Sequence, residues 1–150
     1  MKLLIPPPVY LLLALGLMWL LKHYAPVFNF QGFPWNILGW NFIGIALISD
    51  LYALALFFKA HTTFNPIKPQ NSQHLVTTGT YRFSRNPMYL GMVFILLGWG
   101  LVLGELSTFI IIPLFMWVLT AMQIKPEEAI LAKHFGADYQ TYLHQVRRWL

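Results

Sequence analysis

Long uncharged apolar runs alternate with polar segments along this chain. The first run lies between Lys2 and Lys22, and its helix is expected to begin near Pro8, because consecutive prolines cannot lie inside a regular helix. Three further runs follow, and apolar runs of roughly 20 residues are long enough to cross the apolar core of a bilayer. The pattern predicts four membrane spans at about residues 8–21, 35–58, 87–104 and 106–124.

Composition supports this interpretation. Of the 150 residues, 57% are hydrophobic and only 10% are charged, whereas soluble domains carry about 25% charged residues. An all-α polytopic membrane protein is therefore predicted, with residues 1–150 forming a single domain. The absence of cysteine excludes disulfides and thiolate catalysis, and no metal site is predicted.

The charges predict the orientation in the membrane. The net charge of +5 is spread over loops rather than along one face, which argues against nucleic-acid binding and favours contact with anionic lipid headgroups. Eight cations fall in the 59–86 loop and the C-terminal tail: Lys59, Lys68, Arg82, Arg85, Lys125, Lys133, Arg147 and Arg148. Because cations favour the inner face, both termini are expected in the cytoplasm of a bacterial or archaeal cell.

Residues 74–91 are the most informative stretch. Asn86 and Pro87 are typical of a helix start, since asparagine can cap and proline suits the first helical position. A helix N-terminus beside arginines binds anions such as carboxylate or phosphate. Arg85 lies one residue from this cap, while Arg82 could equally contact lipid headgroups.

Acidic residues define two more candidate features. Asp50 is the only charge within the second run; it is either functional or faces the helix bundle and pairs with a polar neighbour. Lys125-Pro126 predicts a new helix start, so C-terminal helices are expected over 126–149. One face of the first of them would present Glu128, Leu131, Phe135 and Tyr139. Both Glu127 and Glu128 could also serve only to complement the helix dipole.

Two motifs together resemble a known superfamily. They are Gly79-x-Tyr81-x-x-x-Arg85-Asn86-Pro87-x-Tyr89-x-Gly91 and Glu127-Glu128-x-x-Leu131-x-x-x-Phe135-Gly136-x-x-Tyr139-x-x-Tyr142. In this order, separated by a helix hairpin, they resemble the integral-membrane methyltransferases that include isoprenylcysteine carboxyl methyltransferase and phospholipid methyltransferases. The resemblance covers about residues 74–149, and it implies S-adenosylmethionine as the methyl donor.

The resemblance also implies site residues, by matching positions. A cofactor loop over 68–91 and the C-terminal helices would bind the donor. Arg85 and Glu128 would be the catalytic pair and the opposite ends of one cofactor clamp, with Glu128 meeting the amino group of the donor. The other implied cofactor-binding residues are His74, Leu75, Val76, Gly79, Tyr81, Pro87, Tyr89, Glu127, Phe135 and Tyr139.

The resemblance leaves the acceptor open between a carboxylate and an amine. Many carboxyl methyltransferases of this group have histidine where this chain has Asn86, which cannot titrate near neutrality. An amine acceptor must lose a proton, which His74, Glu127 or Glu128 could take. In either case a lipid or lipidated acceptor arriving from the bilayer is expected.

Two other functions compete with methyl transfer. A membrane reductase with a nicotinamide cofactor would share part of the C-terminal pattern, but the sequence offers no further basic cluster for a second phosphate. A non-enzymatic lipid-binding subunit would need the polar loop and tail residues to serve only at the membrane interface. Binding of S-adenosylhomocysteine or of NADPH distinguishes the three.

Overall fold

The computed structural model describes residues 5–59 and 75–150, and their regular secondary structure is entirely helical. The all-α class is therefore confirmed. In chain order the elements are α1 (Pro7–Tyr24), α2 (Trp35–Lys59), the 3-10 turn η2 (Gly79–Arg82), α3 (Pro87–Leu103), the 3-10 turn η3 (Leu106–Ile110), α4 (Ile111–Leu119), the π-helical turn η4 (Thr120–Ile124), α5 (Lys125–Phe135) and α6 (Ala137–Gln145).

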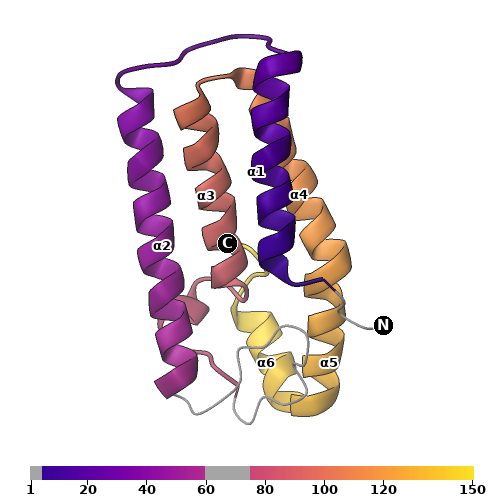
Figure 1. The fold of residues 1–150 in the computed structure, drawn as a ribbon. Helices are drawn as coiled ribbons and strands as arrows, with labels where there is room; N and C mark the ends of the chain where they lie inside the picture. Colours follow the sequence, from indigo (N-terminus) through magenta and orange to yellow (C-terminus); the bar gives the residue numbers. More distant parts are fainter. Residues whose placement is uncertain (1–4, 60–74) are drawn as a thin grey trace.

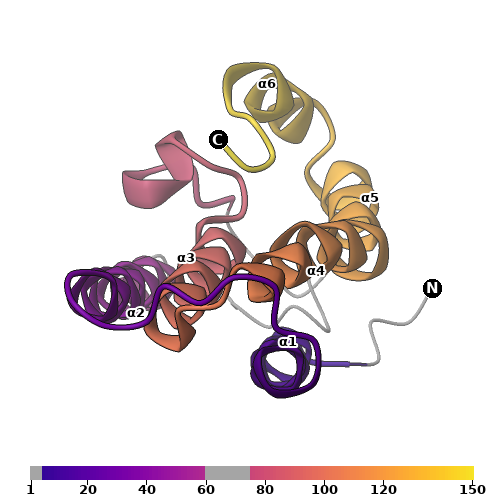
Figure 2. The ribbon, with the colours of Figure 1, turned by 90° about the horizontal axis from the view of Figure 1, so that it is seen from above.

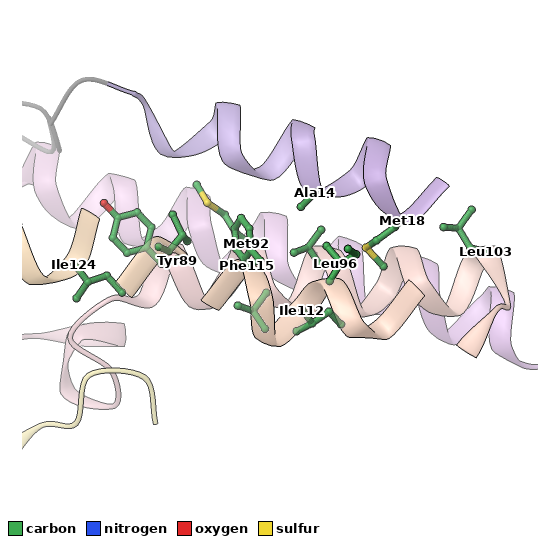
Figure 3. Close-up of a cluster of buried hydrophobic side chains, with 12 residues drawn as sticks. Ala14, Met18, Tyr89, Met92, Leu96, Leu103, Ile112, Phe115 and Ile124 are labelled. Carbon is green, nitrogen blue, oxygen red and sulfur yellow. The ribbon is translucent and has the colours of Figure 1, made fainter. Parts of the chain in front are cut away.

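The long helices form a bundle that alternates in direction (Figure 1). Viewed along the bundle, α3 lies between α2 and α4, and α1 packs against α3 and α4 (Figure 2). Met18 and Leu96 are fully buried where these helices meet (Figure 3), and Leu119 is fully buried in the same cluster. The polar elements η2, α5 and α6 gather at one end of the bundle, and the loops joining α1 to α2 and α3 to α4 lie at the other.

Two of the described helical stretches are long and apolar enough to cross a membrane, Trp35–Leu56 and Leu106–Phe135. The apolar helix α3 is shorter, at 17 residues. Much of the surface of α2 is apolar and exposed: Ile45 and Ile48 are 68% and 70% accessible. Contiguous exposed apolar surface of this kind is typical of contact with lipid or with another protein.

The fourth long helix differs from the prediction. A new helix was expected to start at Lys125-Pro126, but Leu106–Phe135 is one continuous helical stretch of 30 residues. The π turn η4 explains how it passes the proline: the backbone N–H of Lys125 donates to the carbonyl of Thr120, five residues back. Because this wider turn displaces the preceding carbonyls, the Pro126 ring is accommodated without a break. Glu127 and Glu128 therefore lie within a long helix rather than at a free N-terminus.

The chain end also differs from the predicted helix over 126–149. The last helix, α6, ends at Gln145, and Val146 is extended. Asp138 does not cap α6; its N-cap position is Gly136, with a φ of 52° that favours glycine. The extended residues 146–150 can thus turn back to the start of α3, where they make the contacts described below.

At the opposite end of the bundle, Glu105 joins the two loops. It is 1% exposed, and its carboxylate accepts hydrogen bonds from the backbone N–H groups of Val27 and Phe28 at 2.6 and 2.8 Å. In the sequence, Glu105 is the single residue between the predicted spans 87–104 and 106–124. In the structure its carboxylate binds the loop between α1 and α2, and this contact holds that loop against the connection between α3 and α4.

The α2–α3 contact is closest where two glycines face each other. A Cβ at Gly98 would lie 2.5 Å from the carbonyl oxygen of Gly39, and a Cβ at Gly39 would lie equally close to that of Gly98. We expect Gly98→Ala to lower the free energy of unfolding by about 1–3 kcal/mol, because the helices must separate. Gly44→Ala, at an open position on α2, is the matched control for unfolding in mixed micelles. Equal stability of the two variants would contradict the close contact.

Candidate functional site

The loop before α3 is held against α2. Gly79 has a φ of 62°, and a Cβ there would meet Leu56 and Tyr52 of α2, so a side chain would push η2 away from that helix. Two side chains near it are buried: Val76 and Tyr81 pack with Ala53 of α2. These contacts position the loop on α2, and they are made by three predicted site residues: Val76, Gly79 and Tyr81.

Arg85 projects from this loop into a buried environment. Its side chain is 11% exposed, and Nη2 lies 3.3 Å from Oε1 of Glu128. The other two guanidinium nitrogens, Nε and Nη1, are buried and have no hydrogen-bond partner among the described residues. Buried donors are costly to leave unpaired, so this arginine offers two N–H directions to an anionic group.

Glu128 is held by two arginines. Arg148 donates to it with both ends of its guanidinium fork, Nε to Oε1 at 3.0 Å and Nη2 to Oε2 at 2.8 Å. This hydrogen bond and the negative charge of Glu128 raise the pKa of Arg148 above its usual range, against the effect of burial. The guanidinium therefore stays charged, and the bidentate geometry fixes the carboxylate.

This geometry differs from the expected clamp. Arg85 and Glu128 were predicted to lie at opposite ends of a bound donor, yet they contact each other directly. The reason is that α5 continues from α4 and so carries Glu128 down toward the start of α3. The two residues form one end of a site rather than two ends.

Glu127 lies next to Glu128 and contacts a different helix. The hydroxyl of Tyr89, in the first turn of α3, donates to its Oε1 at 2.6 Å. Tyr89 itself is 7% exposed and belongs to the main core (Figure 3). The contact ties α5 to the first turn of α3.

Aromatic side chains of α6 close one side of the site. Tyr139 and Tyr142 are buried together with Val146, and Leu75 and Phe135 pack against them. Burial and the neighbouring charge of Glu128 raise the pKa of Tyr139 to about 12, although Arg85 acts in the opposite direction. The phenol therefore stays protonated at physiological pH and can donate a hydrogen bond.

The C-terminal segment fastens the loop that carries Arg85. The backbone N–H of Arg85 donates to the carbonyl of Arg147 at 3.0 Å. The Asn86 side-chain amide donates to the Arg148 carbonyl at 2.9 Å, and the Ser84 hydroxyl donates to the same carbonyl at 3.3 Å. Asn86 is the N-cap residue of α3, as predicted, but its side chain binds this segment rather than the helix.

The structure brings most of the predicted site residues to one end of the bundle, but in separate environments. Leu75, Phe135 and Tyr139 lie with α6, whereas Val76, Gly79 and Tyr81 lie against α2. A third group lies around the start of α3 and contains Pro87, Tyr89, Glu127 and the Arg85–Glu128 pair. His74 lies outside the described residues.

Arg148 is the residue that the sequence analysis missed. It was counted only as one of the inner-face cations, because its partner Glu128 is 20 residues away and no helical spacing links them. Tyr142, part of the quoted motif but not of the predicted site, also has a specific contact: its hydroxyl donates to the Tyr81 carbonyl at 2.7 Å. This bond connects α6 to η2.

The residues around Arg85 suit a zwitterionic ligand with an apolar portion. The unpaired guanidinium nitrogens fit a carboxylate, and the acidic pair 127–128 fits an ammonium group. Tyr139 and Phe135 offer aromatic faces to a cation or a planar ring. S-adenosylmethionine has all of these groups, so the residues present fit this donor.

The helical bundle and its arginine-centred polar end define the general class, an all-helical protein of membrane type with a candidate anion site. Sequence comparison gives the family. The model of the phospholipid methyltransferase family matches residues 34–138, and the chain belongs to that family.

Two yeast proteins described as protein-S-isoprenylcysteine O-methyltransferase are relatives. The Schizosaccharomyces pombe protein is 28% identical over 83% of this chain and 57% of its own length. The Saccharomyces cerevisiae protein is 33% identical over 62% of this chain and 40% of its own length. An uncharacterized protein of Haemophilus influenzae is 41% identical over 42% of this chain and its own full length. The chain thus spans little more than half of the fission yeast relative, and no solved structure matches it.

Proposed function

We propose that this protein transfers a methyl group from S-adenosylmethionine to a lipid or lipidated acceptor in the membrane. The observation that carries the proposal is Arg85, which presents two buried, unpaired donors at the polar end of a bundle. The chain belongs to a methyltransferase family, and its yeast relatives are described as isoprenylcysteine O-methyltransferases. That description makes a lipophilic acceptor reasonable here.

In this proposal Arg85 binds the carboxylate of the donor, with Arg148 and Glu128 orienting the guanidinium. Glu127 and Glu128 supply negative charge for the amino group, Tyr139 and Phe135 pack on the adenosine, and Leu75 lies behind them. When bound, the donor supplies a methyl group attached to a positively charged sulfur. The protein contributes mainly position, because an in-line displacement accelerates strongly when its reactants are held in line.

The proposal includes four membrane spans, formed by α1, α2, α3 and the α4–α5 stretch. The alternating direction of the helices supports it, because it brings η2, α5 and α6 to one end (Figure 1). Cations concentrate at that end, which the positive-inside rule would place in the cytoplasm with both termini. Methyl donor from the cytosol and acceptor from the bilayer would then meet at the same end.

The decisive experiment compares cofactors. We expect detergent-purified protein to bind S-adenosylhomocysteine in isothermal calorimetry, because this product analogue keeps the carboxylate, the amino group and the adenosine. NADPH should not bind, because only one anion-binding arginine has unpaired buried donors among the described residues. Binding of NADPH alone would favour a reductase, and binding of neither would favour a non-enzymatic lipid-binding protein.

A further inference from the structure

Asp50 on α2 touches the first of the two motifs. Its carboxyl lies directly on the backbone of Gly91 in α3, so closely that a methyl group at position 91 would overlap it. The glycine of the motif is therefore matched to the aspartate. The sequence placed Asp50 in a span that precedes the motifs, whereas the structure brings it beside the candidate site.

The carboxyl has an unsatisfied buried atom. Oδ1 of Asp50 is inaccessible and has no hydrogen-bond partner among the described residues. An acceptor atom buried without a partner costs free energy, and an ionisable group in a membrane helix is costlier still. Because no hydrogen bond or salt bridge among the described residues satisfies this oxygen, a ligand is the simplest reason for the charge of Asp50.

Its surroundings indicate the direction from which a ligand comes. The α2 residues on either side, Leu47 and Leu51, are 50% and 66% exposed, so the outward face of α2 at this level is open to the bilayer. Helix α2 lies at the edge of the bundle (Figure 2). Within the described part of the chain, it packs mainly against α3 and η2. Asp50 faces α3 instead, on the same side of α2 as the buried Ala46 and Ala53, so a ligand would reach it along the α2–α3 contact, from the loop of the candidate site.

Tyr81 links Asp50 to the rest of the site. This side chain is buried in the cluster with Ala53, which is one helical turn beyond Asp50. Burial first, and then the charges of Tyr142, Glu127 and Asp50, raise the pKa of Tyr81 above its usual range. The charges of Glu127, on α5, and of Asp50, on α2, therefore both act on this phenol.

We propose that Asp50 binds the amino group of a membrane-borne acceptor and thereby selects amines over carboxylates. The inference rests on the proposed methyl transfer. An anionic acceptor would be repelled by the Asp50 carboxylate, whereas a protonated amine would pair with it. The amine gives one proton to the Asp50 carboxylate; its freed lone pair then forms the bond to the donor's methyl carbon as the carbon–sulfur bond breaks, leaving a neutral thioether.

Native mass spectrometry of the detergent-purified protein tests this, with oleylamine and oleate as probes of equal chain length. Wild-type protein should bind oleylamine at least about tenfold more tightly than oleate. Asp50→Asn should abolish that preference, and Asp50→Glu should restore part of it. Asp138→Asn, which removes an exposed acidic group of α6, should leave the preference unchanged. A merely structural role for Asp50 would not change the ratio between the two probes.

S-adenosylhomocysteine binding by the same variants separates the two proposals. Its affinity should be within about twofold of wild type in Asp50→Asn. If S-adenosylhomocysteine binds but wild-type protein takes both probes equally, or Asp50→Asn retains the preference, the assignment of Asp50 is wrong while methyl transfer stands. If S-adenosylhomocysteine does not bind the wild-type protein, the proposed function fails first.

Discussion

Replacing Arg85 with alanine is expected to weaken S-adenosylhomocysteine binding by about 1.5–3 kcal/mol, the range for hydrogen bonds to a charged group. This corresponds to a loss of roughly 10- to 150-fold in affinity. The reason is that Nε and Nη1 are buried donors without a partner among the described residues, and an anionic group would pair with them. Isothermal calorimetry on detergent-purified protein measures the change.

Two variants make this result specific. Arg85→Lys should restore only part of the affinity, because one ammonium group cannot keep the contact of Nη2 with Glu128 and also supply donors at the positions of Nε and Nη1. Arg82→Ala removes an exposed cation from the same loop and should leave the affinity within about twofold of wild type. Equal losses at positions 82 and 85 would indicate a diffuse effect of net charge, and an unchanged affinity at 85 would remove the carboxylate site.

The helical class followed from the sequence because apolar runs of membrane length restrict the backbone to few solutions. The start of α3 at Pro87 was also predicted correctly, since Asn86-Pro87 is a local signal. The continuous helix through Lys125-Pro126 was not, because a π turn replaces the usual pairing there. No local pattern encodes that turn, and it decides the direction in which Glu127 and Glu128 point.

The sequence predicted which residues gather at the candidate site better than it predicted their geometry. Family motifs named Arg85, Glu128, Tyr89 and Tyr139, and the structure brings them to one end of the bundle. Contacts between segments far apart in the chain could not be read from spacing. Arg148 reaches Glu128 only because residues 146–150 turn back, and Asp50 meets Gly91 only because α2 and α3 pack closely.

Glu128→Ala is expected to destabilise the fold more than any other single change at the site, by about 2–4 kcal/mol. Removing one member of a buried ion pair costs about 3–5 kcal/mol because a charge is left uncompensated. Here two arginines lose their partner, but Arg148 is 35% exposed and is partly screened by solvent. Arg148→Ala should cost less, since Arg85 still compensates Glu128.

A double-mutant cycle separates this coupling from local packing. The Arg85→Ala/Glu128→Ala double variant should be more stable than the sum of the single losses predicts, with a coupling of about 0.5–3 kcal/mol. Unfolding in mixed micelles gives the free energies, and Asp138→Ala, which removes an exposed carboxylate of α6, controls for net charge. A Glu128→Ala variant as stable as Asp138→Ala would show that the arginines do not depend on Glu128. The backbone carbonyl of Arg148 also accepts a hydrogen bond from Asn86, in the loop before α3. If Glu128→Ala were as stable as the control, such backbone contacts alone would hold the chain end beside Arg85.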